Sequence, residues 1–267
     1  MYKFGFIGAG NMGSAIARGM CKTVNPSDIA VCDTDAAKVN SLSSETGITV
    51  TDIKDISVNS RYIILAVKPQ ALPSVLGTVK DFIVGRDDRF VFVSMAAGTA
   101  VSKIKNLLDT DVPVIRIMPN VPCSVGAGMT LCAPDESITE EELKTFISAY
   151  EGCGAIDVIE ESKIDAYSIV TGCGPAFAYL MIEALADGQV EIGVPRDKAY
   201  LYAAKMIEGS AKLMTESGRI PADLKDSVCS PGGTTIEGVR VLENGAFRSS
   251  VIEAVRASYK RTLELGK

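Results

Sequence analysis

Residues 3–13 read Lys-Phe-Gly-Phe-Ile-Gly-Ala-Gly-Asn-Met-Gly, a short apolar segment that ends in three spaced glycines. Apolar side chains then recur at helical spacing up to residue 20, so the stretch predicts a strand, a tight turn and a helix. Gly8 permits the turn, Gly10 lets the backbone approach a pyrophosphate, and Gly13 allows the helix to pack closely on the strand. We therefore predict a dinucleotide site at this helix N-terminus. The alternative is a glycine turn that serves only the fold.

A second strand is predicted over residues 29–32, and it ends at Asp33. This residue follows Gly13 by 20 positions, about where an acidic side chain accepts hydrogen bonds from the adenosine ribose. A carboxylate there would repel the ribose 2′-phosphate of NADPH, so we expect NADH to be used well. The alternative is that Asp33 points away and that Thr34 or Lys38 meets the phosphate, so the predicted cofactor is NADPH or NADH.

Strands and helices continue to alternate through the first half of the chain. Strands are predicted over residues 62–67, 90–94 and 114–118, and each leads into a loop of glycine, proline or small residues. Residues 129–133 and 155–159 could add edge strands. This order predicts an α/β fold with a Rossmann-type, doubly wound parallel sheet, in which the loops after the strands line one crevice.

Several residues of these loops are candidate cofactor contacts. They are Ala66, Val67, Lys68 and Pro69 after the first of the three strands, Ala96, Ala97 and Gly98 after the second, and Asn120 after the third. For Lys68 the alternative is an exposed loop lysine that binds nothing. For Asn120 the alternative is a turn that the asparagine side chain stabilises.

From residue 162 onward the sequence pattern is almost entirely helical. We therefore predict an α/β domain over residues 1–161 and an all-α dimerisation domain over residues 162–267. Within it, Pro195 begins one helix and Gly218 ends it. Several helices are apolar on more than one face, which in so small a domain favours burial against a second copy of the chain. The alternative is tight packing within one chain.

The composition is that of a globular enzyme, and it argues against several kinds of partner. With 27 basic and 33 acidic residues and no basic cluster, we expect neither nucleic acid nor an anionic membrane surface as a partner. The seven cysteines include no C-x-x-C pair and there is no histidine, so we expect free thiols and no metal site. No leader-like segment precedes the first strand, so we expect a cytoplasmic protein.

The longest apolar run, residues 168–186, is long enough to be compared with a membrane span. It is interrupted by two glycines and a proline, and it carries Glu183, which a lipid-exposed helix would not readily tolerate. We therefore expect a buried helix of a soluble protein here.

A second stretch with chemical meaning is Ser-Pro-Gly-Gly-Thr-Thr, residues 230–235. Its serine and proline suit a helix cap and the first helical position, and its glycines leave backbone N–H groups uncovered. Such N–H groups bind small anions, including carboxylates. The alternative is a glycine turn followed by a capping box between Thr234 and Glu237.

The absence of histidine bears on the reaction. A nicotinamide cofactor moves a hydride onto the carbon of a C=O or C=N bond. A ketone reductase usually needs a strong general acid such as histidine, lysine or tyrosine. An imine nitrogen is protonated more easily, so the hydroxyls of Thr234 and Thr235 beside a carboxylate site indicate a small imino acid as the substrate.

With these motifs in place, the sequence resembles the pyrroline-5-carboxylate reductases over essentially its whole length. The resemblance is carried by residues 5–13 (GFIGAGNMG), 66–69 (AVKP), 96–98 (AAG), 116–120 (RIMPN) and above all 224–253 (LKDSVCSPGGTTIEGVRVLENGAFRSSVIE). It implies a Rossmann domain joined to a helical domain that interlocks with its twin in a homodimer, with larger rings of dimers in some members. It also implies reduction of 1-pyrroline-5-carboxylate to L-proline, the last step of proline biosynthesis.

The resemblance and the motifs together divide the predicted site residues into two groups. The substrate would be held by Ser230, Gly232, Gly233, Thr234 and Thr235, with Thr234 as the catalytic hydroxyl. The cofactor contacts would be Gly8, Ala9, Gly10, Asn11, Met12, Asp33, Ala66, Val67, Lys68, Pro69, Ala96, Ala97, Gly98 and Asn120. One departure from the family is Cys173, where a serine often stands in a Gly-Ser-Gly-Pro motif, and a thiol is the weaker donor.

Two other functions are alternatives. A β-hydroxyacid dehydrogenase shares the glycine turn and the helical domain but needs a K-x-x-x-N motif, and here Lys163 is followed four positions later by Tyr167. A regulator that senses NAD(P) without turnover would have no use for a carboxylate site with adjacent hydroxyls. An assay with reduced cofactor and candidate imino acids separates the enzyme from the regulator.

Overall fold

The computed structural model describes residues 1–265, which form two compact units. Met1–Gly172 and the end of the last helix from Tyr259 belong to the first unit, and Cys173–Ser258 forms the second.

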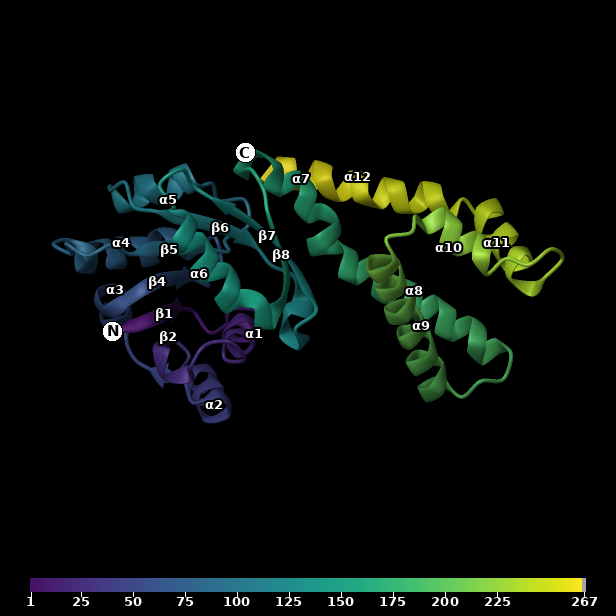
Figure 1. The fold of residues 1–267 in the computed structure, drawn as a ribbon, viewed down its shortest axis with the longest axis horizontal. Coiled ribbons are helices and arrows are strands. Elements are labelled where there is room, and N and C mark those ends of the chain that lie inside the picture. The colour runs from purple at the N-terminus through teal and green to yellow at the C-terminus, as the bar shows by residue number, and fades with distance from the viewer. Residues whose placement is uncertain (266–267) are drawn as a thin grey trace. The chain divides into compact units, whose positions relative to one another are not determined.

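The first unit is built on one eight-stranded sheet (Figure 1). Its strands are β1 (Tyr2–Ile7), β2 (Ile29–Cys32), β3 (Thr49–Val50), β4 (Ser60–Leu65), β5 (Val91–Ser94), β6 (Val114–Met118), β7 (Gly128–Pro134) and β8 (Gly154–Val158). The order across the sheet is β3-β2-β1-β4-β5-β6-β7-β8, and only the β6–β7 pair is antiparallel. The chain order reverses between β1 and β4, which is where ligands bind in doubly wound sheets.

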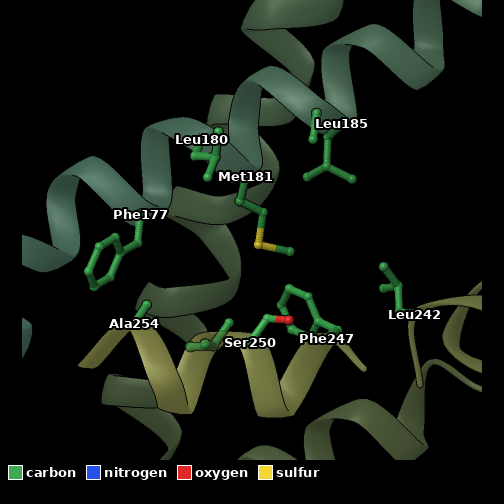
Figure 2. Close-up of a pocket in the computed structure, with 10 residues that line it drawn as sticks. Phe177, Leu180, Met181, Leu185, Leu242, Phe247, Ser250 and Ala254 are labelled. Atoms are coloured by element: carbon green, nitrogen blue, oxygen red, sulfur yellow. The ribbon is translucent and has the colours of Figure 1, made fainter. Parts of the chain in front are cut away.

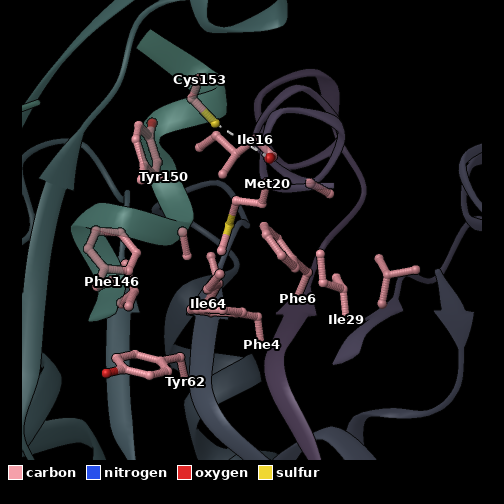
Figure 3. Close-up of a cluster of buried hydrophobic side chains, with 14 of the residues drawn as sticks. Phe4, Phe6, Ile16, Met20, Ile29, Tyr62, Ile64, Phe146, Tyr150 and Cys153 are labelled. Carbon is pink, nitrogen blue, oxygen red and sulfur yellow. Dashed lines mark hydrogen bonds between the residues drawn. The ribbon is translucent and has the colours of Figure 1, made fainter. Parts of the chain in front are cut away.

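Helices cover both faces of this sheet because its central strands are apolar on both sides. The helices are α1 (Asn11–Met20), α2 (Ala36–Thr46), α3 (Ile53–Asn59), α4 (Leu72–Ile83), α5 (Val101–Leu108) and α6 (Glu140–Tyr150). Phe4 and Phe6 of β1 pack with α1, α2 and α6 on one face, and Figure 3 shows this core around Met20 and Tyr150. Ile7 packs with α3, α4 and α5 on the other face. The predicted doubly wound Rossmann fold is confirmed.

The sequence placed most strands correctly but missed β3, which has only two residues. The strand predicted over 62–67 lies at Ser60–Leu65, so Ala66 and Val67 belong to the loop after it. Both further strands form, as β7 and β8, but only β8 lies at an edge of the sheet, because β7 pairs with β6 and β8.

A nearly continuous helical stretch follows the sheet. It consists of the 3₁₀ turn η4 (Glu161–Lys163), α7 (Ile164–Ser168), the π-helical turn η5 (Ile169–Cys173) and α8 (Gly174–Glu191). Ile164 is buried against Leu131 and Ala133 of β7, so the beginning of this stretch belongs to the first unit. The first compact unit therefore extends to Gly172, beyond residue 161, where we predict the domain boundary. The domain boundary itself stays a prediction.

The second unit is entirely helical. It contains α8, α9 (Arg196–Ser217), α10 (Pro221–Ser227), α11 (Thr234–Asn244) and the first part of α12 (Phe247–Leu265), and α8 packs along α9 (Figure 1). Pro195 and Gly218 flank α9 as predicted, with Gly218 in the left-handed conformation at φ 64°.

The apolar stretch over α7 and α8 is not a buried helix within the single chain. Residues Glu161–Glu191 are long and apolar enough to span a membrane by length and composition alone. In α8 only Ala186 is buried, and Leu180 is 67% exposed. Our expectation of a buried helix is therefore not met within one copy of the chain.

Candidate functional site

The glycine turn joins β1 to α1, and two of its glycines are required by close backbone contacts. Gly8 has a φ of +111°, and a Cβ there would lie 2.4 Å from the carbonyl oxygen of Ala66. A Cβ on Gly13 would lie 2.6 Å from the carbonyl oxygen of Gly8 and 2.9 Å from the Cβ of Ala66. The turn can therefore form only with small residues at these places.

Gly10 differs from its neighbours because a Cβ there would meet no described atom within 4 Å. It caps the N-terminus of α1 without a side chain, and the first turn of α1 contains no acidic residue. The first N–H groups of a helix have no partner within the helix, and the helix dipole favours an anion beside them. The turn thus combines open space with uncovered N–H donors, which suits a pyrophosphate.

Three neighbouring strands end at the same level beside this turn. Ile7 is in register with Cys32 of β2 and with Leu65 of β4. The N–H of Gly8 donates to the carbonyl oxygen of Cys32 at 2.8 Å, and the N–H of Ala66 donates to that of Ile7 at 2.9 Å. Of the predicted residues, the structure therefore brings together the glycine turn, the end of β2 and the loop after β4.

Asp33 points toward the glycine turn. Its Oδ2 accepts a hydrogen bond from the N–H of Ala9 at 2.6 Å, and its Oδ1 accepts one from the N–H of Asp35 at 2.9 Å. Asp33 therefore does not point away from the glycine turn, whereas a phosphate contact of Thr34, which lines the same pocket, stays an alternative prediction. Lys38 forms an ion pair with Asp35 instead, at 3.2 Å.

A pocket of about 400 Å³ lies at the ends of β1 and β2. It is lined by Ile7, Gly8, Cys32, Asp33, Thr34, Thr51, Asp52, Ile53, Val67, Ala71 and Val75. Its apolar walls beside a carboxylate suit an adenine ring and its ribose. We name it the adenosine pocket.

Sequence reasoning missed several residues of the adenosine pocket. Asp52 and Ile53 follow the very short β3, and Ala71 and Val75 lie at and within the beginning of α4. The apolar spacing of α4 was visible in the sequence, but it could not tell which side chains face a ligand.

The remaining loop residues are placed as follows. Lys68 is exposed, and it has no ion-pair partner among residues 1–265, whereas Ala96 is buried. Gly98 is exposed and has a φ of +65°. Asn11 is exposed at the start of α1, and Met12 is half-buried against the core. Their cofactor contacts stay predictions.

Arg116 forms a network that the sequence analysis did not find. Its buried side chain in β6 contacts Asp165 at 2.6 Å and Glu161 at 3.4 Å. Glu161 in turn accepts a hydrogen bond from the N–H of Val101 at 2.7 Å, at the start of α5. The loop containing Ala96–Gly98 is thereby fixed at its far end. The signal was an arginine inside an otherwise apolar strand.

Asn120 links three segments of the first unit. It is buried, its Nδ2 donates to the carbonyl oxygen of Thr171 at 2.9 Å, and its Oδ1 accepts from the N–H of Met129 at 3.0 Å. These contacts reach beyond its own turn, so the side chain does not form the local turn that was one of our two interpretations. Its contact with a cofactor stays a prediction.

The second motif, Ser230–Thr235, forms a turn that differs in detail from our expectation. The N–H of Gly233 donates to the carbonyl oxygen of Ser230 at 3.0 Å, and Gly232 has a φ of +67°. Proline followed by a glycine with positive φ is the pattern of a type II turn. Pro231 therefore lies in this turn and not at the first helical position, and Ser230 is not the cap of α11.

The helix α11 begins at Thr234, with Gly233 as its cap residue and no side-chain capping bond. The capping box between Thr234 and Glu237 is therefore wrong, and Glu237 bonds to Arg240 instead, at 2.8 Å. Thr234 and Thr235 are exposed, and within the described part of the chain the Thr234 hydroxyl has no hydrogen-bond partner. A free hydroxyl thus stands beside the uncovered N–H groups of a helix N-terminus.

Comparisons with known proteins cover the whole chain. A family model described as pyrroline-5-carboxylate reductase dimerisation matches residues 161–265, and one described as NADP oxidoreductase coenzyme F420-dependent matches residues 3–98. Pyrroline-5-carboxylate reductase 3 of Danio rerio is 41% identical over 99% of this chain and 91% of its own length. The pyrroline-5-carboxylate reductase of Escherichia coli K12 is 40% identical over 99% of this chain and 98% of its own length.

Solved structures agree with these matches. A pyrroline-5-carboxylate reductase from Coxiella burnetii has a TM-score of 0.91 at 29% identity, covering 100% of this chain and 99% of that one. A pyrroline carboxylate reductase of Plasmodium falciparum with NADP bound has a TM-score of 0.87 at 28% identity, covering 100% and 98%. The glycine turn, the Ser-Pro-Gly-Gly turn before a helix and these similarities lead to one conclusion: the chain belongs to the pyrroline-5-carboxylate reductase family.

Proposed function

We propose that this enzyme reduces the C=N bond of 1-pyrroline-5-carboxylate to give L-proline, with NADPH or NADH as the hydride donor. The observation that carries the proposal is the turn at Ser230–Gly233, which leads into α11 and leaves the hydroxyl of Thr234 free beside uncovered N–H groups. A cyclic imino acid offers a carboxylate for the N–H groups and a nitrogen for the hydroxyl.

The first unit suits a dinucleotide. A methyl group in place of Gly8 or Gly13 would overlap neighbouring atoms, whereas the space beside Gly10 is open. We infer that the uncovered N–H groups at the start of α1 bind the pyrophosphate and that the adenosine pocket takes the adenosine. When bound, the reduced nicotinamide supplies a hydride to the imine carbon.

The second unit supplies the residues that we propose bind the substrate. We infer that the N–H groups at the start of α11 bind the carboxylate, where the helix dipole favours a negative charge. Ser230, Gly232, Gly233, Thr234 and Thr235 are the residues proposed for this role. The positive φ of Gly232 and the short approach of Gly233 to Ser230 fix the turn, so its donors are ordered before a ligand arrives.

Thr234 is proposed to position the imine nitrogen. Its hydroxyl can donate or accept one hydrogen bond at the imine nitrogen. The nitrogen is protonated first, and the adjacent carbon then receives the hydride. Because a protonated imine already carries the positive charge that attracts the hydride, no strong general acid is needed, which is consistent with a chain that contains no histidine.

We further propose that the helical domain, residues 162–267, forms a homodimer, which could assemble into larger rings of dimers in the cytoplasm. The family model for dimerisation covers nearly this range. Apolar side chains of α8, α11 and α12 line a pocket of about 440 Å³, with Phe177 and Met181 facing Phe247 and Ala254 (Figure 2). A second copy of the chain would cover these apolar groups and restore the burial that one copy lacks.

The test is a reductase assay in which loss of reduced cofactor is followed after addition of 1-pyrroline-5-carboxylate. Proline must form in equal amount to the cofactor oxidised. A cyclic imine without the carboxylate serves as the control, and we expect it to react far more slowly because the N–H groups of α11 have no anion to bind. Binding of the cofactor without turnover of the imino acid would favour the regulator and contradict the proposal.

A further inference from the structure

The adenosine pocket contains two carboxylates, and they bear on which cofactor it accepts. Its walls are apolar, from Ile53, Val67, Ala71 and Val75, and its polar groups include Asp33 and Asp52. The inference below rests on the proposed function, because it takes the pocket to bind the adenosine end of a nicotinamide dinucleotide.

The position of Asp33 is fixed by the backbone. The N–H of Ala9 holds one carboxylate oxygen at 2.6 Å and the N–H of Asp35 holds the other at 2.9 Å. The hydroxyl of Thr34 also donates to Oδ1, at 3.4 Å. An ionised carboxylate has about four acceptor positions, so Oδ2 keeps room for a further donor. The two hydroxyls of an adenosine ribose are such donors, whereas a 2′-phosphate brings only acceptors and a negative charge.

Asp52 adds a second fixed charge. It caps α3, where its side chain accepts a hydrogen bond from the N–H of Asp55 at 2.7 Å. Burial, followed by the charges of Asp33 and Asp52, raises the pKa of the Cys32 thiol to about 12. Both carboxylates therefore act on the same small region at the end of β2.

No positive charge offsets these two carboxylates in the pocket. Neither lysine nor arginine is among its lining residues in the described chain. Lys38, which was the alternative partner for a phosphate, lies 3.2 Å from Asp35 in an ion pair. Among the lining residues of the described chain, a 2′-phosphate would meet two carboxylates and no cationic side chain.

We propose that Asp33, assisted by Asp52, makes the adenosine pocket selective for an unphosphorylated ribose, so that the enzyme uses NADH in preference to NADPH. Asp33 is the specificity-determining residue, because its carboxylate lines the pocket that we infer takes the ribose and can accept a hydrogen bond from a ribose hydroxyl. Asp52 contributes through its charge alone and has the smaller effect.

The experiment measures binding of two adenosine fragments, 5′-ADP and 2′,5′-ADP, by calorimetry, together with NADH and NADPH by fluorescence. These fragments contain no nicotinamide, so the result does not depend on catalysis. We expect 5′-ADP to bind at least about tenfold more tightly than 2′,5′-ADP, since one like-charge contact near a protein surface is sufficient for that ratio. NADH should likewise bind more tightly than NADPH.

Three variants and one control variant locate the cause of the selectivity. Asp33→Ser should reduce the ratio by about tenfold, and Asp52→Asn should reduce it less while keeping a good helix cap. Asp33→Asn keeps an oxygen for the N–H of Ala9 and serves if the serine variant does not fold. Asp28→Ser is the matched control, since it removes the same charge at the opposite end of β2, about 16 Å away, and should leave the ratio unchanged.

Equal or tighter binding of 2′,5′-ADP by the unaltered protein would overturn the inference. So would an Asp33→Ser variant that binds both fragments with an unchanged ratio, or an Asp28→Ser variant that changes the ratio as much. Selective binding of NADH without reduction of the imino acid would contradict the proposed function and leave this inference standing. Reduction of the imino acid with equal use of NADH and NADPH would support the proposed function and contradict this inference.

Discussion

The side-chain amide of Asn120 donates a hydrogen bond to the carbonyl oxygen of Thr171 at 2.9 Å. Pro175 lies four residues after Thr171 and has no N–H, so it cannot make the usual helical bond to this carbonyl. Asn120 thus donates to a backbone carbonyl within the π-helical turn at Ile169–Cys173, and it ties that turn to the loop after β6.

This relationship predicts that Asn120→Asp is destabilising. The aspartate keeps an oxygen for the N–H of Met129 but offers no donor to Thr171, so a half-buried acceptor loses this hydrogen bond, at a cost of about 1 kcal/mol. Urea unfolding measures this effect, and cofactor affinity measured on the same variant tests the other role. A variant of unchanged stability with weaker cofactor binding would show that Asn120 is a cofactor contact after all.

Thr234→Ala should lower turnover about ten- to a thousandfold, the range for loss of one positioned polar group. Because Gly233 and not Thr234 caps α11, the melting temperature and cofactor affinity should stay unchanged. Thr234→Ser keeps the hydroxyl and should recover most of the rate. Full activity in the alanine variant would mean that the proton reaches the imine from solvent before it binds.

The two glycines Gly10 and Gly13 should respond oppositely to a methyl group. Gly10→Ala fits the fold, so its stability should change by less than about 1 kcal/mol, while dinucleotide binding weakens by about tenfold or more. Gly13→Ala places a Cβ 2.6 Å from the carbonyl oxygen of Gly8 and should cost about 1–3 kcal/mol of stability. Thermal unfolding and calorimetric titration with NADH check both variants. Equal loss of stability in the two would contradict this picture of the turn.

Glu142 predicts a specific dependence of stability on pH. The hydrogen bonds from Arg89, at 2.7 and 2.9 Å, are the main cause that lowers the pKa of this buried carboxyl from its ordinary value of 4.5 to about 2. The stabilisation is therefore fully present above about pH 4.5 and is lost as the pH falls toward 2, with a size on the order of 3 kcal/mol.

Urea unfolding at several pH values tests this dependence on Glu142→Gln, which should be less stable at neutral pH and less sensitive to acid than the unaltered protein. Glu141→Gln is the control, because Glu141 is exposed beside it. An unaltered protein whose stability does not fall between about pH 4.5 and 2 would contradict the role of the pair.

Leu180→Asp should weaken the proposed dimer. Leu180 is 67% exposed in the single chain and lines the apolar pocket of the second unit, so a charge there would be buried on association. Light scattering over a range of concentrations should show a monomer where the unaltered protein is dimeric. Val84→Asp, at an apolar side chain 75% exposed in the first unit, is the control and should not alter assembly.

The sequence predicted most of the sheet because every strand except β3 has a strong local signal. The sequence shows apolar runs that stop at turn residues, and they correspond to β1 before the glycine turn, to β2 ending at Cys32 and to β6 at Val114–Met118. β3 was missed because a two-residue strand has no periodicity, and Asp52, which follows it, was missed for the same reason.

The site was predicted less completely, because several contacts depend on the tertiary fold. The bond from Asn120 to Thr171 and the ion pair of Arg116 with Asp165 join residues about fifty positions apart. At the second motif the residue types were right but the conformation was wrong, because Pro-Gly fits a type II turn as well as a helix start. Because Gly233 is the cap residue of α11, the hydroxyl of Thr234 makes no capping bond.

The close approach of Gly8, Gly13 and Ala66 has an evolutionary consequence. A larger side chain at any one of these positions would need space now filled by the other two residues. The glycines cannot become smaller, and Ala66 could lose only its methyl group. Selection for a different cofactor would therefore leave these three positions unchanged. Laboratory lineages under such selection should accumulate substitutions at the end of β2 and after β3, where side chains face open space.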